Sequence, residues 1–181
     1  ETIKVYGEIE INKDFTEKDI NKVLTNLYST NFFETVDVNL KNNVLIVNLE
    51  EYPVINQLVI TGEKKKANRE QIKKIIQLKE KSSFIKSYLA NDIELIKRLY
   101  SSLGYNFSEV EGKVRQIDKS NLDLLISINR GEQTKISSIK FIGNKKVRTK
   151  RLKDIIASEE SKFWKVLSKN TILSENLINL D

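Results

Sequence analysis

The chain has 181 residues, of which 39% are apolar and 31% are charged, and its formal net charge is +6. This length suits one ordinary domain or two to three small modules, and the apolar content argues against a disordered chain. The sequence contains neither cysteine nor histidine, which excludes disulfides and thiolate chemistry and removes the commonest general base. We therefore expect no enzyme, and no catalytic residue, cofactor or metal site.

The first 53 residues predict a helix followed by a hairpin. Thr16 begins a helical stretch with one apolar face, made of Ile20, Val23, Leu24, Leu27 and Tyr28. Strands are expected at about residues 35–40 and 44–49, joined by Asn42-Asn43, a pair typical of hairpin turns. Before Thr16, the alternation of Ile3, Val5, Ile9 and Ile11 taken alone indicates a short strand.

Residues 54–132 carry a longer pattern. A strand from about Val54 to Thr61 precedes two helices. Asn68, with Gln71 three residues later, is the expected cap of the first helix. The second helix covers about residues 86–103, and Gly104 follows it where a left-handed C-terminal cap is expected.

Two strands then follow, at about residues 105–116 and 122–128. The second is the more apolar and is placed in the centre of the sheet, which leaves the first at an edge. Its apolar residues change phase halfway along, so we predict a β-bulge near Ser108-Glu109. The expected core consists of Leu58, Ile60, Ile72, Ile76, Ile93, Ile96, Leu99, Leu124 and Ile126.

The chain repeats itself. The run from Ile55 to Gly62 recurs from Ile136 to Gly143, and each run precedes a helical pattern, with Leu152, Ile155 and Ile156 in the later copy. The segment Leu27-Tyr28-Ser29-Thr30 likewise recurs as Leu99-Tyr100-Ser101-Ser102. Three copies of a strand–helix–helix–strand–strand unit are implied, at residues 1–53, 54–132 and 133–181. The first copy lacks its first strand, and the third ends in its second helix, after Ile172, Leu177 and Leu180.

This repeated order resembles the POTRA domains of the BamA-type outer-membrane assembly family, a domain also found in TamA and a chloroplast homologue. The resemblance is carried by residues 27–36, by Glu51-Tyr52-Pro53 at a joint between modules, and by the aromatic pair Phe163-Trp164. It covers essentially the whole chain and is closest to the first three modules of such a protein. It also makes residues 1–7 the tail of a helix, against the local alternation.

The resemblance implies an α+β fold of tandem modules, each with two helices on one face of a three-stranded mixed sheet. It implies a periplasmic position ahead of a membrane barrel outside this chain. The implied partners are unfolded outer-membrane proteins and accessory lipoproteins. The joints, at Glu51-Tyr52-Pro53 and Arg130-Gly131-Glu132, are expected to be short and semi-rigid.

An exposed strand edge can accept an extended client strand by backbone hydrogen bonds. The expected edge residues are Thr35, Val36, Asp37 and Val38 in the first module and Glu111, Gly112, Lys113, Val114 and Arg115 in the second. In the second module, proline at Lys113 or Arg115, whichever N–H points outward, should weaken client binding.

The alternative function is that of a basic α/β module that binds nucleic acid. Basic residues cluster at Lys64 to Lys66 and from Lys145 to Arg151, as phosphate contacts would require. The sequence offers no glycine-bearing basic loop and no matching pair of aromatic strands, so the binding of protein clients is favoured. The acidic pair Glu159-Glu160 is expected to be solvated in a polar loop.

Overall fold

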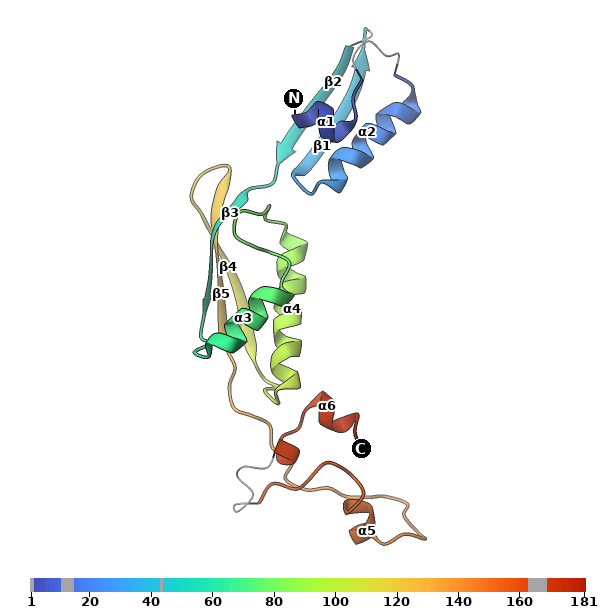
Figure 1. Cartoon of the computed structure of the whole chain (residues 1–181), viewed down its shortest axis with the longest axis vertical. Coiled ribbons are helices and arrows are strands. Elements are labelled where there is room, and N and C mark those ends of the chain that lie inside the picture. Colours follow the sequence, from blue (N-terminus) through green and yellow to red (C-terminus); the bar gives the residue numbers. More distant parts are fainter. Residues whose placement is uncertain (1, 11–14, 43, 163–168) are drawn as a thin grey trace. The chain divides into compact units, whose positions relative to one another are not determined.

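The computed structural model describes residues 2–10, 15–42, 44–162 and 169–181 (Figure 1). The backbone groups into two compact units, one made of residues 1–58, 78–88 and 114–124 and the other of residues 59–77, 89–113 and 125–181. Across the described ranges, no helix combines the length and the apolar character needed to cross a bilayer.

The first part of the chain folds as two helices and a hairpin. The elements are α1 (Thr2–Gly7), α2 (Glu17–Ser29), β1 (Phe33–Lys41) and β2 (Val44–Glu51). Thr16 caps α2, because its hydroxyl accepts the Asp19 N–H while the Asp19 carboxylate accepts the Thr16 N–H. The core of this part consists of Val23, Leu27, Phe33, Val36 and Val38. Residues 2–7 are helical, so the family resemblance predicted this segment correctly and the local alternation did not.

Strands β1 and β2 pair in an antiparallel register that runs from Thr35 opposite Glu50 to Lys41 opposite Val44, with an irregularity between Phe33 and Thr35. The hairpin is therefore confirmed. Asn43 of the predicted turn, like Ile11 of the earlier alternation, lies outside the described residues.

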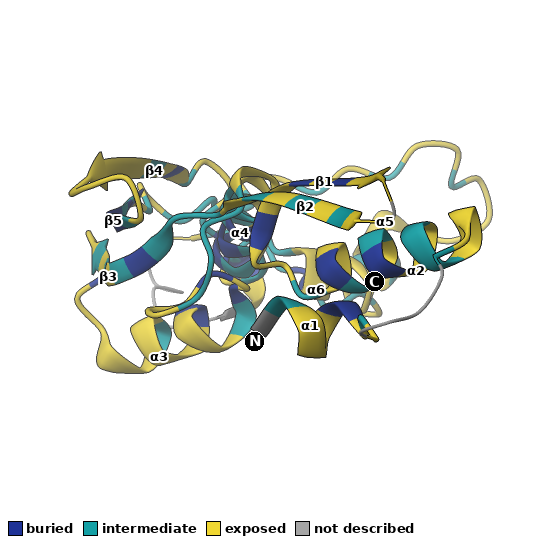
Figure 2. Ribbon diagram, turned by 90° about the horizontal axis from the view of Figure 1, so that it is seen from above, coloured by how far each residue is buried: buried dark blue, intermediate teal, exposed yellow. Residues whose placement is uncertain are grey.

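The five elements predicted for residues 54–132 are all present. They are β3 (Val54–Thr61), α3 (Lys66–Ile75), α4 (Lys86–Ser102), β4 (Glu109–Gln116) and β5 (Asn121–Asn129). The sheet order is β3-β5-β4, with β5 in the centre, and α3 and α4 lie on the same side of the sheet (Figures 1 and 2). Val54 donates its N–H to the Ser120 carbonyl, and Gly62 lies against the backbone of Ile128, so β3 runs parallel to β5. The fold is thus α+β with a mixed sheet.

The start of β4 corrects one prediction. Residues 105–108 form a turn, in which the Ser108 N–H bonds to the Tyr105 carbonyl, and the strand begins only at Glu109. The predicted strand over residues 105–108 and the predicted bulge at Ser108-Glu109 are therefore wrong. The apolar residues change from odd to even positions where the turn ends and the strand begins. The strand therefore needs no extra residue to keep its apolar side chains on one face.

The predicted core is confirmed in its centre. Five of the expected residues are buried, namely Ile72, Ile76, Ile96, Leu124 and Ile126. Four others are only half-buried, namely Leu58, Ile60, Ile93 and Leu99. The buried core also includes five residues that were not among the predicted core residues, namely Ile55, Leu78, Tyr100, Leu122 and Ile128.

The beginning of α3 is organised by Glu63 rather than by Asn68. The helix starts at Lys66, and the residue at its N-cap, Lys65, makes no side-chain cap. Glu63 is 4% exposed, and its carboxylate accepts the Lys65 N–H at 2.7 Å, the Asn68 amide at 2.9 Å and the Tyr100 hydroxyl at 2.6 Å. Because the Asn68 side chain lies within α3 and donates to Glu63, the prediction that it caps the helix is wrong.

Hydrogen bonding keeps Glu63 charged. Burial by itself would raise the pKa of this carboxyl, but the hydrogen bonds from Asn68, Tyr100 and the Lys65 amide outweigh it and lower the pKa below 4.5. Burial and the bond to Glu63 raise the pKa of the Tyr100 hydroxyl. The pair therefore joins α4 to the loop after β3 as a carboxylate and a neutral phenol.

The last part of the chain departs from the predicted repeat. Residues 136–143 form no strand, and the only helical segments described after residue 133 are α5 (Thr149–Lys153), η1 (Lys169–Thr171) and α6 (Glu175–Ile178). Ile142 and Ile155 are exposed, against expectation. In the middle module β3 pairs with β5, whereas the residues described after 143 include no strand with which residues 136–143 could pair. A lone strand has unpaired backbone groups and is unstable. Phe163-Trp164 lies outside the described residues.

The first predicted joint is short, and both predicted joints carry backbone hydrogen bonds. Tyr52 and Pro53 alone separate β2 from β3, and the Tyr52 N–H donates to the Phe32 carbonyl at 2.9 Å. At the second joint, the Thr134 N–H donates to the Gly104 carbonyl at 2.9 Å. A side chain on Gly104, which has φ +87°, would lie 2.1 Å from Ile172. Glycine at this helix end thus permits close packing, while semi-rigidity of the joints stays a prediction.

We predict that Ile96→Ala lowers the free energy of unfolding by about 2–5 kcal/mol, because Ile96 is 0% exposed and truncation leaves a cavity. Urea denaturation measures this change. Ile117→Ala is the matched control, since Ile117 is 49% exposed and its loss should cost no more than about 0.5 kcal/mol. Equal effects of the two substitutions would contradict the assigned core.

We further predict that Glu63→Gln destabilises the chain by about 1.5–3 kcal/mol at neutral pH, the range for hydrogen bonds to a charged group. A carboxyl whose pKa is lowered on folding stabilises the protein above its ordinary pKa of 4.5, and this contribution is lost as pH falls through the folded value. The gap between wild type and variant should therefore narrow below about pH 4.5. Glu70→Gln, on the exposed face of α3, is the control at neutral pH and should change the free energy of unfolding by no more than about 0.5 kcal/mol.

Candidate functional site at the strand edges

The outer edge of β3 is covered by the loop that precedes α4. The Ile55 N–H donates to the Ser82 carbonyl at 2.9 Å, and the Lys81 N–H donates back to Ile55 at 2.7 Å. Further along, the Glu80 carboxylate accepts the Leu58 N–H at 3.1 Å. The first half of this edge is thus occupied by the chain itself.

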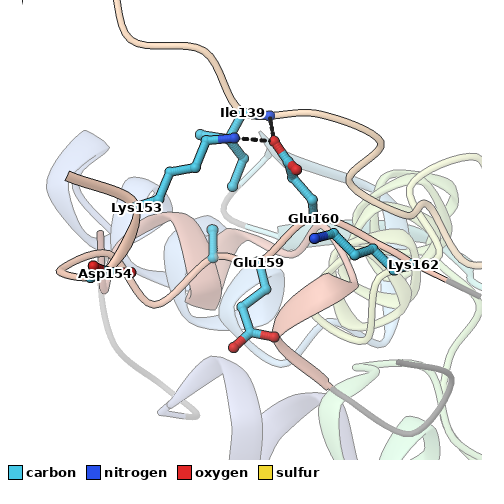
Figure 3. Close-up of a pocket in the computed structure, with 7 residues that line it drawn as sticks. Ile139, Lys153, Asp154, Glu159, Glu160 and Lys162 are labelled. Atoms are coloured by element: carbon cyan, nitrogen blue, oxygen red, sulfur yellow. Dashed lines mark hydrogen bonds and ion pairs between the residues drawn. The ribbon is translucent and has the colours of Figure 1, made fainter. Parts of the chain in front are cut away.

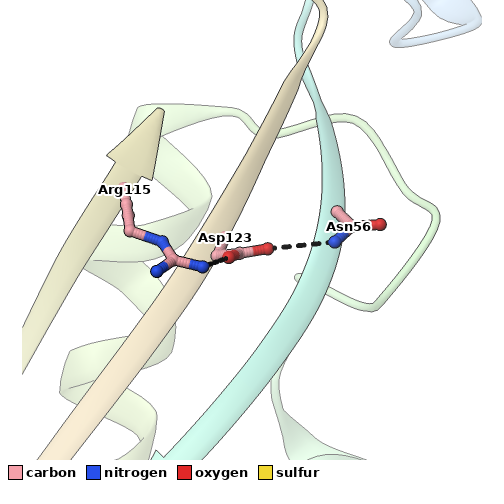
Figure 4. A network of polar contacts seen from close by, with 3 residues as sticks. All are labelled: Asn56, Arg115 and Asp123. Carbon is pink, nitrogen blue, oxygen red and sulfur yellow. Dashed lines mark hydrogen bonds and ion pairs between the residues drawn. The ribbon is translucent and has the colours of Figure 1, made fainter. Parts of the chain in front are cut away.

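Asp123 ties the three strands together on the face away from the helices (Figure 4). This residue of the central strand accepts a bond from Arg115 of β4 at 2.5 Å and another from the Asn56 amide of β3 at 3.1 Å. The Arg115 guanidinium holds the pKa of Asp123 below its ordinary value, and Asn56 adds to this effect. Arg115, a predicted edge residue, is therefore fixed by the sheet through its side chain.

The backbone of β4 presents alternate residues to solvent. The Ile117 N–H donates to the Asn121 carbonyl at 3.0 Å, so the backbone at residue 117 faces the central strand. Because backbone groups alternate in direction along a strand, Arg115 and Lys113 also direct their N–H groups to β5, while those of Val114 and Gly112 face outward. Proline at Lys113 or Arg115 would break the sheet, so Val114 is the informative position. Figure 2 shows most of β4 exposed.

The outer edge of β1 is partly closed by a tyrosine. The Tyr28 hydroxyl from α2 accepts the Val36 N–H at 3.1 Å and donates to the Val36 carbonyl at 3.4 Å. Both backbone groups of Val36 therefore face away from β2 and already have a partner. Thr35 and Asp37 pair with Glu50 and Asn48 of β2, which leaves Val38 as the predicted edge residue whose backbone can face a client.

The outer edge of β2 has a different status. By the internal repeat, β2 corresponds to β5, and in the middle module β3 occupies the corresponding edge of β5. The internal repeat therefore predicts that a strand of the repeat unit takes the β2 edge. Of the two edges of the three-stranded sheet, β4 is the more open to a strand from another chain, because the loop before α4 bonds to β3.

A polar cavity of about 250 Å³ lies in the last part of the chain, lined by Ile139, Lys153, Asp154, Ser158, Glu159, Glu160 and Lys162 (Figure 3). Glu160 accepts the Ile139 N–H at 3.0 Å and pairs with Lys153, which lowers the pKa of Glu160. Glu160 is thus half-buried and paired, and its predicted solvation is wrong. Because its carboxylate is already neutralised by Lys153, we assign no ligand to this cavity.

The described residues define an α+β fold, with a two-stranded and a three-stranded sheet whose strand edges are open polar surfaces. Comparison with known sequences agrees. The family model of POTRA, described as a surface antigen variable number repeat, matches residues 53–131. Outer membrane protein assembly factor BamA of Neorickettsia risticii is 24% identical over 99% of this chain, and that of Neisseria meningitidis is 25% identical over 96%.

The chain spans 24% and 22% of the lengths of these two relatives. Among solved structures, POTRA domains 3–5 of Haemophilus influenzae BamA match with a TM-score of 0.49 and 18% identity, over 99% of this chain and 76% of that one. Residues 53–131 thus match the POTRA family model, and nearly the whole chain is similar to the BamA-type outer-membrane assembly factors.

We predict that Tyr28→Phe speeds amide hydrogen exchange at Val36, because the substitution removes the hydroxyl that bonds to both of its backbone groups. A hydrogen bond worth about 0.5–1.5 kcal/mol corresponds to an acceleration of roughly two- to tenfold. The Asp37 amide, which belongs to a pair with Asn48, is the internal control and should keep its rate. An unchanged rate at Val36 in the folded variant would contradict the closed edge.

Proposed function

We propose that this chain is part of the periplasmic scaffold of an outer-membrane β-barrel assembly machine and that it holds extended segments of unfolded outer-membrane proteins. The observation that carries the proposal is the outer edge of β4, where the N–H groups of Gly112 and Val114 face away from the sheet. An extended segment aligned there would continue the sheet by one strand, as in β-augmentation.

Three features support β4 over the other edges. The loop at residues 79–83 covers the first half of the β3 edge, and Tyr28 occupies the backbone of Val36 on β1. On β4, by contrast, Glu111, Lys113 and Arg115 are exposed and carry their side chains on the open face of the sheet, away from the outward backbone groups. Charged edge residues of this kind limit indiscriminate pairing while leaving the backbone available.

The edge of β1 is a second proposed site. Binding along Thr35 to Val38 requires the Tyr28 hydroxyl to leave Val36, so a client would gain less there than on β4. Accessory lipoproteins are further proposed partners, and their support comes from the family alone.

Backbone recognition suits a general assembly factor. The hydrogen bonds of an added strand come from main-chain groups that every client shares, whereas side-chain pockets would select one sequence. The scaffold would thus bind many unfolded segments weakly and release them readily.

We predict that Val114→Pro weakens the binding of a fluorescein-labelled peptide from an outer-membrane β-strand by about tenfold, since proline removes an outward N–H and crowds the edge. Val114 is 42% exposed, so the loss of its side chain should be tolerated. Fluorescence anisotropy gives the dissociation constants, and circular dichroism checks the fold.

Val114→Thr is the matched control, because it keeps the N–H and the β-branched shape, and its affinity should stay within about twofold of wild type. If a folded Val114→Pro variant binds the peptide as tightly as Val114→Thr does, strand addition at β4 is wrong.

A further inference from the structure

Helix α4 comes unusually close to the edge strand at Gly112. A β-carbon built on Gly112 would lie 2.7 Å from the Cδ1 atom of Leu89 and 3.1 Å from its Cδ2 atom. Leu89 thus occupies the space that a side chain of the edge strand would otherwise fill. Gly112 is the residue that admits it, because any other residue would displace those methyl groups.

The two faces of β4 differ in character beside this contact. Val110 is 7% exposed, and Gly112, two residues on, lies on the same helix-covered face, under Leu89. Three exposed residues lie on the open face, namely Glu109, Glu111 and Lys113. The Lys113 Nζ atom lies 3.4 Å from the Glu111 Oε2 atom. The edge therefore presents apolar contacts on one face and charges on the other.

An added strand would meet both faces. Residues directly opposite each other on neighbouring strands have their β-carbons about 4.5–5.5 Å apart. Gly112 has no side chain that could contact the added strand. The methyl groups of the half-buried Leu89 lie where that side chain would be. A large apolar side chain opposite Gly112 would pack against Leu89, whereas a charged one would lose water there without gaining a partner.

We propose that Leu89, held over Gly112, is a specificity-determining residue of the β4 edge. It favours peptides that place a large apolar side chain opposite Gly112 while their alternate residues, on the open face, are polar. This inference rests on the proposed strand addition to β4. It goes further in assigning selectivity to a helix residue that makes no backbone contact with the client.

Two labelled peptides of equal length test the proposal with the full chain. In one, phenylalanine and threonine alternate; in the other, serine replaces each phenylalanine, so that no register places a large apolar side chain opposite Gly112. We expect wild type to prefer the phenylalanine peptide by about five- to tenfold, the value of a partly buried apolar side chain.

In Leu89→Ala the preference should fall to less than about twofold, because the apolar contact is lost while the backbone edge is retained. Leu103→Ala is the matched control, since Leu103 is a 39% exposed leucine and follows α4 at its other end. Gly112→Ala is a second variant: its β-carbon must displace Leu89, so the preference should fall there too. If Leu89→Ala fails to fold, Gly112→Ala decides the result.

The outcomes separate the two proposals. If Val114→Pro weakens both peptides but Leu89→Ala and Gly112→Ala keep the full preference, strand addition stands and the role of Leu89 is overturned. If Val114→Pro weakens neither peptide, the proposed function itself fails. Loss of preference in both Leu89→Ala and Gly112→Ala, with Leu103→Ala unchanged, supports the assignment.

Discussion

An open β-sheet leaves two rows of backbone N–H and C=O groups without a neighbouring strand, and each row must bond to something or face water. The two sheets of this chain meet that constraint in different ways. A loop covers the first half of the β3 edge, a tyrosine covers part of β1, and charged side chains flank the open backbone of β4. A strand from another chain can pair only with an edge whose backbone groups have no partner yet. The candidate site therefore follows from which edges the chain already covers.

The internal repeat shows how one residue type serves two purposes. Tyr28 and Tyr100 occupy matching places in the repeated segment near the end of a helix. Tyr28 is 45% exposed and closes a strand edge, whereas Tyr100 is 1% exposed and bonds to the buried Glu63. A tyrosine at the matching position thus covers part of a strand edge in one copy and links α4 to the loop after β3 in the other. Copies of a unit can therefore share a fold and still differ in which edges they leave open.

Periodicity alone predicted much of the middle module. The strand predicted from Val54 to Thr61 has the observed bounds of β3, and the helix predicted at residues 86–103 matches α4 to within one residue. Local patterns could not reveal Glu63, because its partner Tyr100 lies 37 residues away. Nor could they show which N–H groups of β4 face outward, since that depends on how the hairpin pairs. The strand at residues 136–143 was wrongly predicted because a strand needs a partner, and its own pattern says nothing of one.

The central proposal is that alternate backbone groups of β4 receive a client strand. The direct measurement is amide hydrogen exchange by NMR, on the full chain with and without a saturating unfolded outer-membrane peptide. The proposal predicts slower exchange at Gly112 and Val114, with little change at Lys113 and Arg115, whose N–H groups already face β5. Unchanged exchange at Gly112 and Val114 while the peptide is bound would contradict it.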